Sequence, residues 1–552
     1  MTKAQRSSWK SHISNELIFL LLFIIVVSVH GISLRDHFVN WDDEMMIINN
    51  PRIMNLSLDG ILHILDPHTV FTDRFSEYYP IRDLSYMIDY FIWGLDPLGY
   101  HLTNLLFEIA NVILVFILFQ RLFNDRALSL LSAMIFAVHP LTAGVVSWVS
   151  CRKDLMAMTF YLIAFIYFME FYRSNKESDK RKIKYFILSN IMFLFALLSK
   201  ASALPFPGVL VAYMFIVEDE RHLKPYILYL ILPATLMMTY ALGSYSYSSY
   251  FGTGTFKQTY GWDWFFMFFP ELFVIYTVRF LFPFNLAPLY IEPGNSSLLE
   301  PLFLISILFI ILIVYLFFKY IRKDKALFFG FAWIILNMVP ASNIISIQIK
   351  TADRFTYIAL AGFGLFLSRI FQIVAYKLKG ISFSTAAISI ASLAVISFML
   401  NLTWYNGVTL WKREIQTRPY IPGVMETLWG YAMLGQAYRQ EGDYHNALKY
   451  TQFVLSINPD YYPSLKEMAD IYVHEGRYEQ AINMYKQALK VDNMDIYRSS
   501  DYIIIAQLYE KMHKYKEAIQ AYEMAKKEPH PAYNDKGLDA RIKKLKDLIN
   551  EE

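Results

Sequence analysis

Long apolar stretches with short polar breaks fill the chain up to about residue 404, and beyond that point charged residues become frequent. A helix that crosses a bilayer needs about 20 mostly apolar residues. The pattern predicts eleven spans, at 16–34, 103–122, 127–145, 155–172, 185–203, 204–217, 226–243, 301–318, 326–345, 355–376 and 384–403. We therefore expect a membrane helix bundle over residues 1–404, a linker at 405–427 and a soluble domain at 428–552.

A further aromatic stretch at 264–282 carries Pro270, Glu271 and Arg279, and the positions of basic residues decide how it lies. Lys and Arg mark cytoplasmic loops. They cluster before the first span and near 121–126, 173–184, 221–224, 319–325 and 377–379, and these loops share one side only if 264–282 does not cross. We expect an interfacial segment there, the N-terminus inside and the soluble domain outside. Twelve spans with a cytoplasmic C-terminus would break this pattern.

The region after the linker contains an internal repeat. Leu434-Gly435, Tyr438, Gly442, Tyr444 and Ala447 are followed 34 residues later by Met468-Ala469, Tyr472, Gly476, Tyr478 and Ala481, and a third copy includes Ala506, Tyr509, Tyr515 and Ala518. This is the tetratricopeptide period. It predicts three antiparallel helix pairs capped by a Lys-rich helix at 536–550, so the whole chain is expected to be all-α. Stacked helix pairs of this kind form a concave groove that usually holds a peptide or a partner protein. The alternative is that the repeats are a spacer that binds nothing.

Composition narrows the class of protein. The 552 residues are 55% hydrophobic and only 18% charged, which excludes a soluble protein of several domains. The net charge of +3 gives no indication of nucleic-acid binding. With Cys151 as the one cysteine, a disulfide framework and a Cys-based zinc site are excluded. The spacing of His, Asp and Glu matches no metal motif, and the need for a divalent ion stays open.

Carboxylates and cations gather on the predicted outer face. The longest outer loop, 35–100, begins with Asp42 and Asp43, and Glu44 follows them. A carboxylate there can act as general base for an incoming hydroxyl. The other charged residues expected on this face are Arg152, Lys153, Asp154, Lys200, Asp353 and Arg354. Together they would suit a lipid-phosphate donor, with cations on the leaving phosphate. Loop solvation, helix capping and snorkelling are the alternatives for each residue taken singly.

Three polar residues near the outer ends of the second and third spans are weaker candidates for the site. His101 and Asn104 lie at the start of the second span, and His139 lies at the end of the third. Polar residues within spans are costly, so each has a packing or a ligand role. Packing against polar partners in the bundle is the alternative for all three.

The ordered motifs resemble those of a known family. They are Phe38-Val-Asn-Trp-Asp-Asp43, Asn50-Pro51, Gly94-Leu-Asp-Pro-Leu-Gly-Tyr-His101-Leu-Thr-Asn104, His139-Pro140, Trp148-Val-Ser-Cys-Arg152-Lys153-Asp154, Ser199-Lys200 and Ala352-Asp353-Arg354-Phe355. Followed by tetratricopeptide repeats, they resemble the transmembrane and tetratricopeptide-repeat-containing protein O-mannosyltransferases and their bacterial relatives, of the GT-C glycosyltransferase class. Relatives commonly carry an acidic residue shortly after His-Pro, where this chain has Thr142-Ala-Gly144.

The resemblance implies a GT-C membrane bundle and an inverting transfer of a sugar, such as mannose, from a polyprenyl-phosphate or dolichyl-phosphate carrier to Ser or Thr hydroxyls of a protein. It implies Asp42 or Asp43 as the base and Arg152, Lys153, Lys200 and Arg354 as candidates for the donor phosphate. The repeats would present the acceptor protein. The membrane is expected to be a bacterial inner membrane with periplasmic repeats, or the endoplasmic reticulum with lumenal repeats. Two rival hypotheses are a non-catalytic scaffold that recruits proteins through its repeats, and a GT-C enzyme with a glycan or lipid acceptor.

Overall fold

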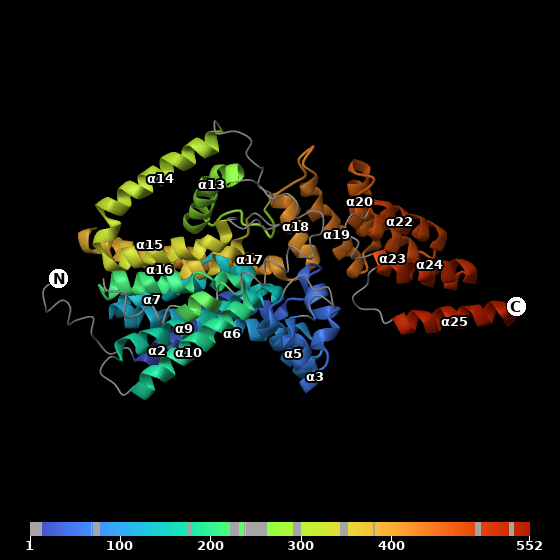
Figure 1. The fold of residues 1–552 in the computed structure, drawn as a ribbon. Coiled ribbons are helices and arrows are strands. Elements are labelled where there is room, and N and C mark those ends of the chain that lie inside the picture. The colour runs from blue at the N-terminus through green and yellow to red at the C-terminus, as the bar shows by residue number, and fades with distance from the viewer. Residues whose placement is uncertain are drawn as a thin grey trace.

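The computed structural model describes residues 14–67, 69, 78–174, 179–220, 231–236, 238, 262–290, 300–342, 351–378, 381–491, 498–528 and 535–551. Within them the chain is all-α, as predicted. The long helices of the N-terminal part run mostly along one direction (Figure 1). They are α2 (Asn15–His30), α6 (Pro97–Phe123), α7 (Arg126–Val138), α9 (Arg152–Arg173), α10 (Asp179–Ser199), α14 (Pro301–Lys319), α15 (Lys325–Met338), α16 (Tyr357–Leu378) and α17 (Ile381–Asn401).

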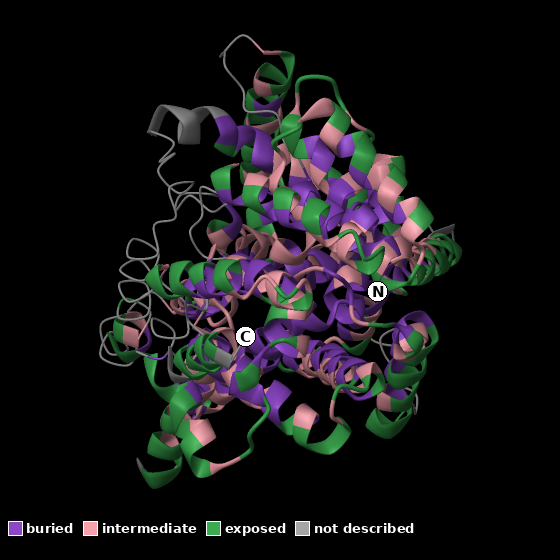
Figure 2. Ribbon diagram, turned by 90° about the vertical axis from the view of Figure 1, so that its right-hand side faces the viewer, coloured by how far each residue is buried: buried purple, intermediate pink, exposed green. Residues whose placement is uncertain are grey.

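The predicted spans correspond to helices wherever the structure describes them. Eight helical segments within the described ranges are long and apolar enough to cross a membrane, and a bent pair brings the number to nine. The stretch at 201–217, which contains α11 (Phe206–Ala212), is a shorter apolar helix. The span predicted at 226–243 lies mostly outside the described residues. Buried positions gather in the middle of the bundle and exposed ones on its outside (Figure 2).

The span predicted at 127–145 is broken in the structure. It consists of α7 and a second piece that runs from Pro140 into α8 (Ala143–Ser147), with a bend of 53° between them. Proline lacks an N–H and disfavours helical geometry at the residue before it. His139, which precedes Pro140, is accordingly extended, with a ψ of 132°. Ser147 ends the second piece, and Trp148 follows it directly.

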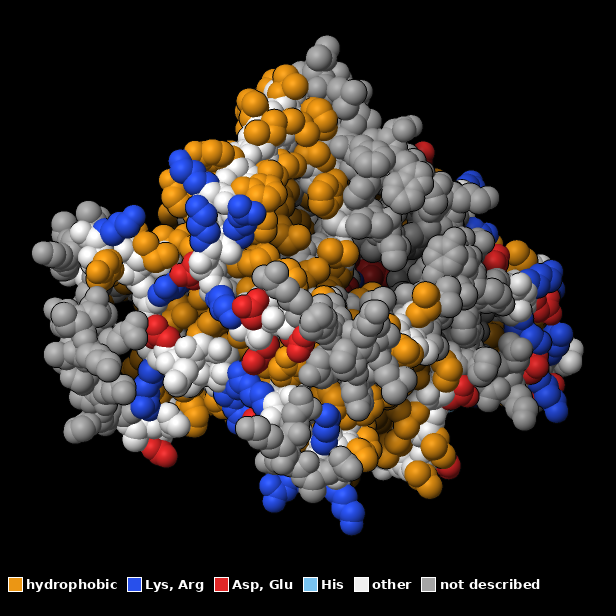
Figure 3. Space-filling model, turned by 60° about the vertical axis from the view of Figure 1, so that its left-hand side comes forward, with side chains coloured by type: hydrophobic (Ala, Val, Ile, Leu, Met, Phe, Trp, Pro, Cys, Tyr) orange, Lys and Arg blue, Asp and Glu red, His pale blue; other side chains and the backbone are white. Residues whose placement is uncertain are grey.

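The basic turns meet at one end of the bundle. Arg126 donates a hydrogen bond to Asn15 at 2.7 Å, and Arg173 pairs with Glu218 at 3.0 Å. The Lys325 Nζ donates to the backbone oxygen of Val217 at 2.8 Å. Figure 3, which turns this end toward the viewer, shows Lys and Arg side chains in groups beside broad hydrophobic surface. The described parts of the predicted cytoplasmic turns thus lie at one end of the bundle, and residues 1–13, 175–178 and 221–224 lie outside the described ranges.

The first outer loop and the soluble helices lie beyond the opposite end of the bundle (Figure 1). The loop contains the short η2 (Glu44–Ile48), α3 (Leu58–Leu65) and α5 (Pro80–Trp93). The aromatic stretch predicted as interfacial is α13 (Trp262–Leu281). After the last span, α18 (Gly407–Thr417) starts with a capping box in which Asn406 and Thr409 bond reciprocally. It leads directly into the repeats.

Three helix pairs form the repeats, followed by a final helix. The pairs are α19 (Trp429–Gln440) with α20 (Tyr444–Ile457), α21 (Tyr462–His474) with α22 (Tyr478–Val491), and α23 (Arg498–Lys511) with α24 (Tyr515–Lys527), and the last helix is α25 (Asp535–Glu551). Small residues let the paired helices approach. A Cβ added to Gly435 of α19 would lie 2.9 Å from the Thr451 hydroxyl oxygen of α20, so a larger side chain there does not fit without displacement.

Candidate active site

The Asp43 carboxylate holds the start of the outer loop in place through hydrogen bonds. Its carboxylate accepts hydrogen bonds from the Val39 backbone N–H at 3.1 Å, the Ser150 N–H at 3.0 Å and the Ser150 hydroxyl at 2.5 Å. The side chain is only 1% exposed, whereas the preceding Asp42 is half-buried. Burial raises the pKa of Asp43 to about 7, although the Ser150 and Val39 bonds oppose that shift. Asp43 therefore fixes the loop on the segment before α9, and Asp42 is the more accessible carboxylate of the pair.

Trp41, the residue before the carboxylate pair, belongs to an aromatic stack on which Arg354 lies. Trp41 stacks on Trp148 with ring centroids 4.3 Å apart, and Trp148 stacks on Trp404 at 5.5 Å. The Arg354 guanidinium lies 5.3 Å from the Trp148 centroid and 5.9 Å from that of Trp41. Arginine over indole faces is a favourable cation–π arrangement. Arg354 makes no hydrogen bond or ion pair with the residues that the structure describes, so its charge is available to a ligand.

The linker helix and the first repeat contact the same loop. The Trp411 indole N–H donates to the Asn40 side-chain oxygen at 2.9 Å, and the Asn40 amide donates to the Met433 backbone oxygen of α19 at 2.9 Å. Glu44, two residues beyond Asp42, accepts a hydrogen bond from Gln440 of the same helix. Burial raises the pKa of Glu44, and the bond from Gln440 opposes this. The loop with the carboxylate pair is thus held between bundle and repeats.

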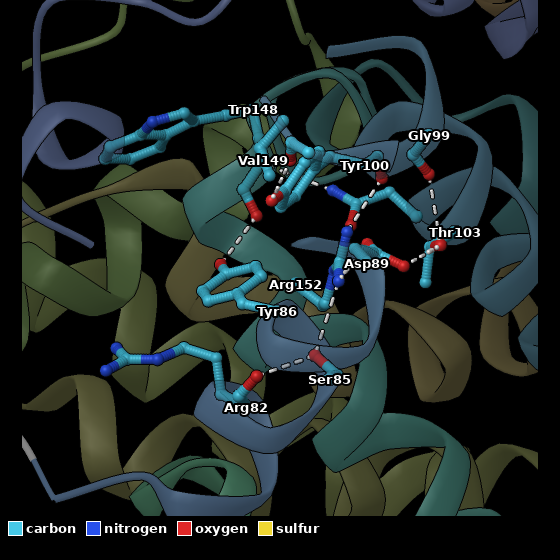
Figure 4. A network of polar contacts seen from close by, with 12 residues as sticks. Arg82, Ser85, Tyr86, Asp89, Gly99, Tyr100, Thr103, Trp148, Val149 and Arg152 are labelled. Atoms are coloured by element: carbon cyan, nitrogen blue, oxygen red, sulfur yellow. Dashed lines mark hydrogen bonds and ion pairs between the residues drawn. The ribbon is translucent and has the colours of Figure 1, made fainter. Parts of the chain in front are cut away.

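Arg152 lies at the centre of a closed polar network (Figure 4). It is fully buried and forms an ion pair with Asp89 at 2.5 Å. Its remaining donors reach the Asn104 side-chain oxygen at 2.9 Å, the Tyr100 backbone oxygen at 2.8 Å and the Ser85 hydroxyl at 3.3 Å. The predicted phosphate ligand is therefore neutralised and saturated by α5 and α6. In this arrangement Arg152 ties the outer loop to the start of α9.

Lys200 is paired in the same manner, and Lys153 lies beside an aromatic ring. The Lys200 ammonium lies 2.6 Å and 2.7 Å from the two carboxylate oxygens of Asp154. The Lys153 ammonium lies 5.6 Å from the ring centroid of Tyr79 in the outer loop. Both cations lie at the predicted end of the bundle. Asp154, which we predicted for the site, acts as the counter-ion of Lys200.

Asp353 belongs to a cluster that the sequence did not indicate. Its carboxylate accepts a hydrogen bond from the Tyr290 hydroxyl at 2.9 Å and lies 3.8 Å from an Arg279 nitrogen. Arg279 and Arg418 both lie over the Tyr290 ring, with 3.5 Å and 4.2 Å to the centroid. Arg279 comes from α13 and Arg418 follows α18, so the pattern of neither segment alone shows this contact. The cluster joins α13, the segment that follows it, the segment before α16 and the linker.

The three weaker candidates are buried among packed helices. The His139 Nε2 lies 3.0 Å from the Phe280 backbone oxygen, and its Nδ1 accepts from the Leu141 N–H at 3.3 Å. Asn104 donates to the backbone oxygens of Val146 and Trp148, each at 3.3 Å. His101 is 1% exposed near the start of α6. These contacts match the packing alternative for His139 and Asn104.

A small pocket opens beside the aromatic stack. It has room of about 50 Å³, and Trp148, Cys151, Arg354, Leu400, Trp404 and Arg413 are among its lining residues. Arg413, from α18, was not a sequence candidate. Within the described ranges, no group of three or more His, Cys, Asp and Glu is arranged to hold a metal ion.

Comparison with known sequences shows which proteins this chain resembles. Residues 87–244 match the sequence model of the dolichyl-phosphate-mannose-protein mannosyltransferases, and residues 438–499 match that of the tetratricopeptide repeat. The human protein O-mannosyl-transferase TMTC3 is 24% identical over 461 residues, which cover 75% of this chain and 48% of the relative. Human TMTC4 is 30% identical over 191 residues, covering 31% of this chain and 25% of the relative. The chain resembles the TMTC protein O-mannosyl-transferases. It spans less than half of the length of these two relatives.

Two solved structures are distantly similar to the chain. The oligosaccharyltransferase AglB from Archaeoglobus fulgidus, in complex with an inhibitory peptide and a dolichol-phosphate, matches with a TM-score of 0.37 and 11% identity, over 81% of this chain and 60% of that one. ArnT from Cupriavidus metallidurans, bound to undecaprenyl phosphate, matches with a TM-score of 0.37 and 13% identity, over 92% and 79%. The matches to sequence models and to curated sequences confirm the predicted resemblance to the protein O-mannosyltransferases with tetratricopeptide repeats.

Proposed function

We propose that the protein is an integral membrane glycosyltransferase of the GT-C class that moves a sugar, mannose in the simplest case, from a polyprenyl-phosphate carrier to Ser or Thr hydroxyls of proteins. One observation carries the proposal. The carboxylate pair Asp42 and Asp43 directly follows Trp41, Trp41 stacks on Trp148, and the Arg354 guanidinium lies over both rings. The names of the similar mannosyl-transferases support this assignment.

We assign the base to Asp42. Asp43 already accepts three hydrogen bonds and is almost fully buried, so an acceptor hydroxyl reaches it poorly. Asp42 is half-buried on the same turn, directly after Trp41. In the reaction the acceptor oxygen forms a bond to the anomeric carbon, the bond from that carbon to the phosphate oxygen breaks, and the phosphate leaves with the electron pair. The hydroxyl proton passes to Asp42.

Arg354 is the best placed of the four predicted phosphate ligands. A phosphate that leaves with a growing negative charge is stabilised by a preorganised cation. Arg152 and Lys200 are already paired with Asp89 and Asp154, and an ion pair with a carboxylate competes with a ligand phosphate. The aromatic faces under Arg354 hold its guanidinium in place without neutralising it.

The repeats are proposed to hold the acceptor protein close to the base. Asn40 and Glu44 flank Asp42 and contact α19 and its C-terminal residues. A segment bound along the repeats would therefore begin next to the carboxylate pair. The exposed position of the repeats beyond the end of the bundle supports access for a protein rather than for a membrane lipid (Figure 1).

The test is sugar transfer by the full chain in liposomes, with polyprenyl-phosphate mannose as donor and a Ser/Thr-rich peptide as acceptor. We expect Asp42→Asn to lower kcat by about 100-fold or more at an unchanged melting temperature. Asp547→Asn, an exposed aspartate of α25, is the matched control and should leave kcat unchanged. The anomeric configuration of the product should be opposite to that of the donor. Full activity of Asp42→Asn would refute the base assignment. Absence of transfer with retained binding of proteins to the repeats would favour the scaffold hypothesis.

A further inference from the structure

The pocket beside the aromatic stack is built from distant parts of the chain. Trp148 and Trp404 form its aromatic wall, and Leu400 comes from the last turn of α17. Arg354 comes from the segment before α16, and Arg413 comes from α18, the helix that leads into the repeats. Bundle and linker therefore contribute one guanidinium each to the same small space.

Neither guanidinium group forms an ion pair or a hydrogen bond to a carboxylate of the described residues, although the charge of Arg354 acts on the neighbouring Asp353 carboxylate. The Arg354 guanidinium lies over the rings of Trp41, Trp148 and Phe355. The Arg413 Nε is buried and makes no hydrogen bond with the described part of the chain. The lining carboxylate is Asp353, and it is engaged by Tyr290 at 2.9 Å and Arg279 at 3.8 Å. This contrasts with Arg152 and Lys200, each of which contacts a carboxylate within 2.6 Å.

Two like charges that line one small pocket repel each other, and an anion bound between them removes that repulsion. Guanidinium groups bind phosphate oxygens through paired N–H donors, and two of them can hold one phosphate from two sides. A single water needs about 10–15 Å³ of such space. A pocket of about 50 Å³ thus has room for a tetrahedral anion but not for a whole lipid-linked sugar.

The position of the pocket indicates the source of the anion. Leu400, Thr403 and Trp404 lie at the end of the last predicted span, where the apolar part of the bundle stops. A phosphate carried by a lipid is presented at that depth, whereas its hydrocarbon chain stays in the bilayer. Trp41 and Trp148 connect the pocket to the turn that carries Asp42.

We propose that Arg354 and Arg413 together bind the phosphate of the lipid donor, so that α18 completes the donor site. The inference rests on the proposed function and deepens it. It makes the helix between bundle and repeats a part of the donor site. Because α18 also carries Trp411, which bonds to Asn40, the phosphate site and the carboxylate loop share one support. The donor is then bound fully only when α18 is docked on the bundle.

The test is a binding measurement with a ligand that lacks the sugar. Farnesyl phosphate is titrated into the full-length protein in detergent, followed by tryptophan fluorescence, with inorganic phosphate in a parallel series. We expect Arg354→Ala and Arg413→Ala each to raise the Kd for farnesyl phosphate at least 10-fold, and the double variant to raise it little further, since both residues hold one group. Lys412→Ala, from the preceding position of the same helix, should keep the wild-type Kd because Lys412 is exposed beside Tyr438.

Several outcomes separate the possibilities. An unchanged Kd in Arg413→Ala would overturn the inference even if Asp42→Asn abolishes transfer. Equal Kd values for inorganic phosphate and farnesyl phosphate would show an anion site without lipid selectivity and would also overturn it. Loss of binding in Arg413→Ala together with no transfer by the wild type would support the site and refute the proposed activity. If Arg413→Ala does not fold, the Kd for farnesyl phosphate is measured with Arg413→Lys instead. This variant keeps the charge, so its Kd should rise, but less than 10-fold, and an unchanged Kd would overturn the inference.

Discussion

Trp411 donates a hydrogen bond from its indole Nε1 to the side-chain oxygen of Asn40, 2.9 Å away. The bond joins α18 to the loop that carries Asp42 and Asp43. The approach is close, since a Cβ added to Gly407 at the start of α18 would lie 2.2 Å from the same Asn40 oxygen. Asn40 in turn donates to the backbone of α19. Loop, linker and first repeat thus share a contact that tolerates little displacement.

We predict that Trp411→Phe lowers kcat for sugar transfer by about 10- to 100-fold, because a small displacement of a catalytic group costs this much. Phenylalanine keeps most of the packing and removes the bond to Asn40. Asn40→Ala should give a similar decrease. Hydrogen–deuterium exchange checks the cause independently of activity, and residues 37–44 should exchange faster in both variants. Lys449→Ala, exposed on α20, serves as control. Unchanged exchange and unchanged kcat in Trp411→Phe would contradict the coupling.

Variants of Arg152 can distinguish a structural role of this residue from a role in binding the donor phosphate. Removing one partner of a buried ion pair costs about 3–5 kcal/mol, because the other charge stays buried and unpaired. We therefore expect Arg152→Met to lower the melting temperature in detergent strongly, and Arg152→Met combined with Asp89→Asn to recover part of the loss. Arg121→Ala breaks the exposed pair with Glu170 and should cost at most about 1 kcal/mol. If Arg152 bound the donor phosphate instead, Arg152→Lys would raise the Kd for farnesyl phosphate without lowering the melting temperature.

The span pattern and the repeats could be predicted because their signals are local. A run of apolar residues and a 34-residue period need no knowledge of distant contacts. Whether a charged residue is paired or buried depends on contacts between distant segments, and these could not be predicted from the sequence. The motif around Arg152 gave no sign that Asp89, on another helix, neutralises it. Arg413 stands beside the exposed Lys412 on a short charged helix, and only docking of α18 on the bundle buries its Nε. The break at Pro140 was not predicted, because the length of the apolar stretch 127–145 favours one continuous span.

The raised pKa of Asp43 leads to a prediction for the pH dependence of stability. An aspartate has a pKa of 3.8 in its ordinary state, and burial brings that of Asp43 to about 7. Between these values the folded protein binds more protons at this position than the unfolded chain does. The free energy of unfolding therefore decreases as the pH rises from about 4 to about 7, and this contribution is constant above that range.

Asp43→Asn removes the titrating group, so the difference in melting temperature between pH 5 and pH 8 should become smaller than in the wild type. Part of the difference will persist, since burial also raises the pKa of Glu414 to about 7 and that of Asp36 to about 8. At pH 4, where Asp43 is protonated in the folded protein, the variant should be less stable than the wild type, because the Asn amide nitrogen cannot accept the bond that Val39 or Ser150 donates, and one unsatisfied buried donor costs about 1–3 kcal/mol. Differential scanning fluorimetry in detergent at half-unit pH steps measures both effects, with Asp547→Asn as the exposed control. An identical pH dependence in Asp43→Asn and wild type would show that Asp43 does not titrate in this range.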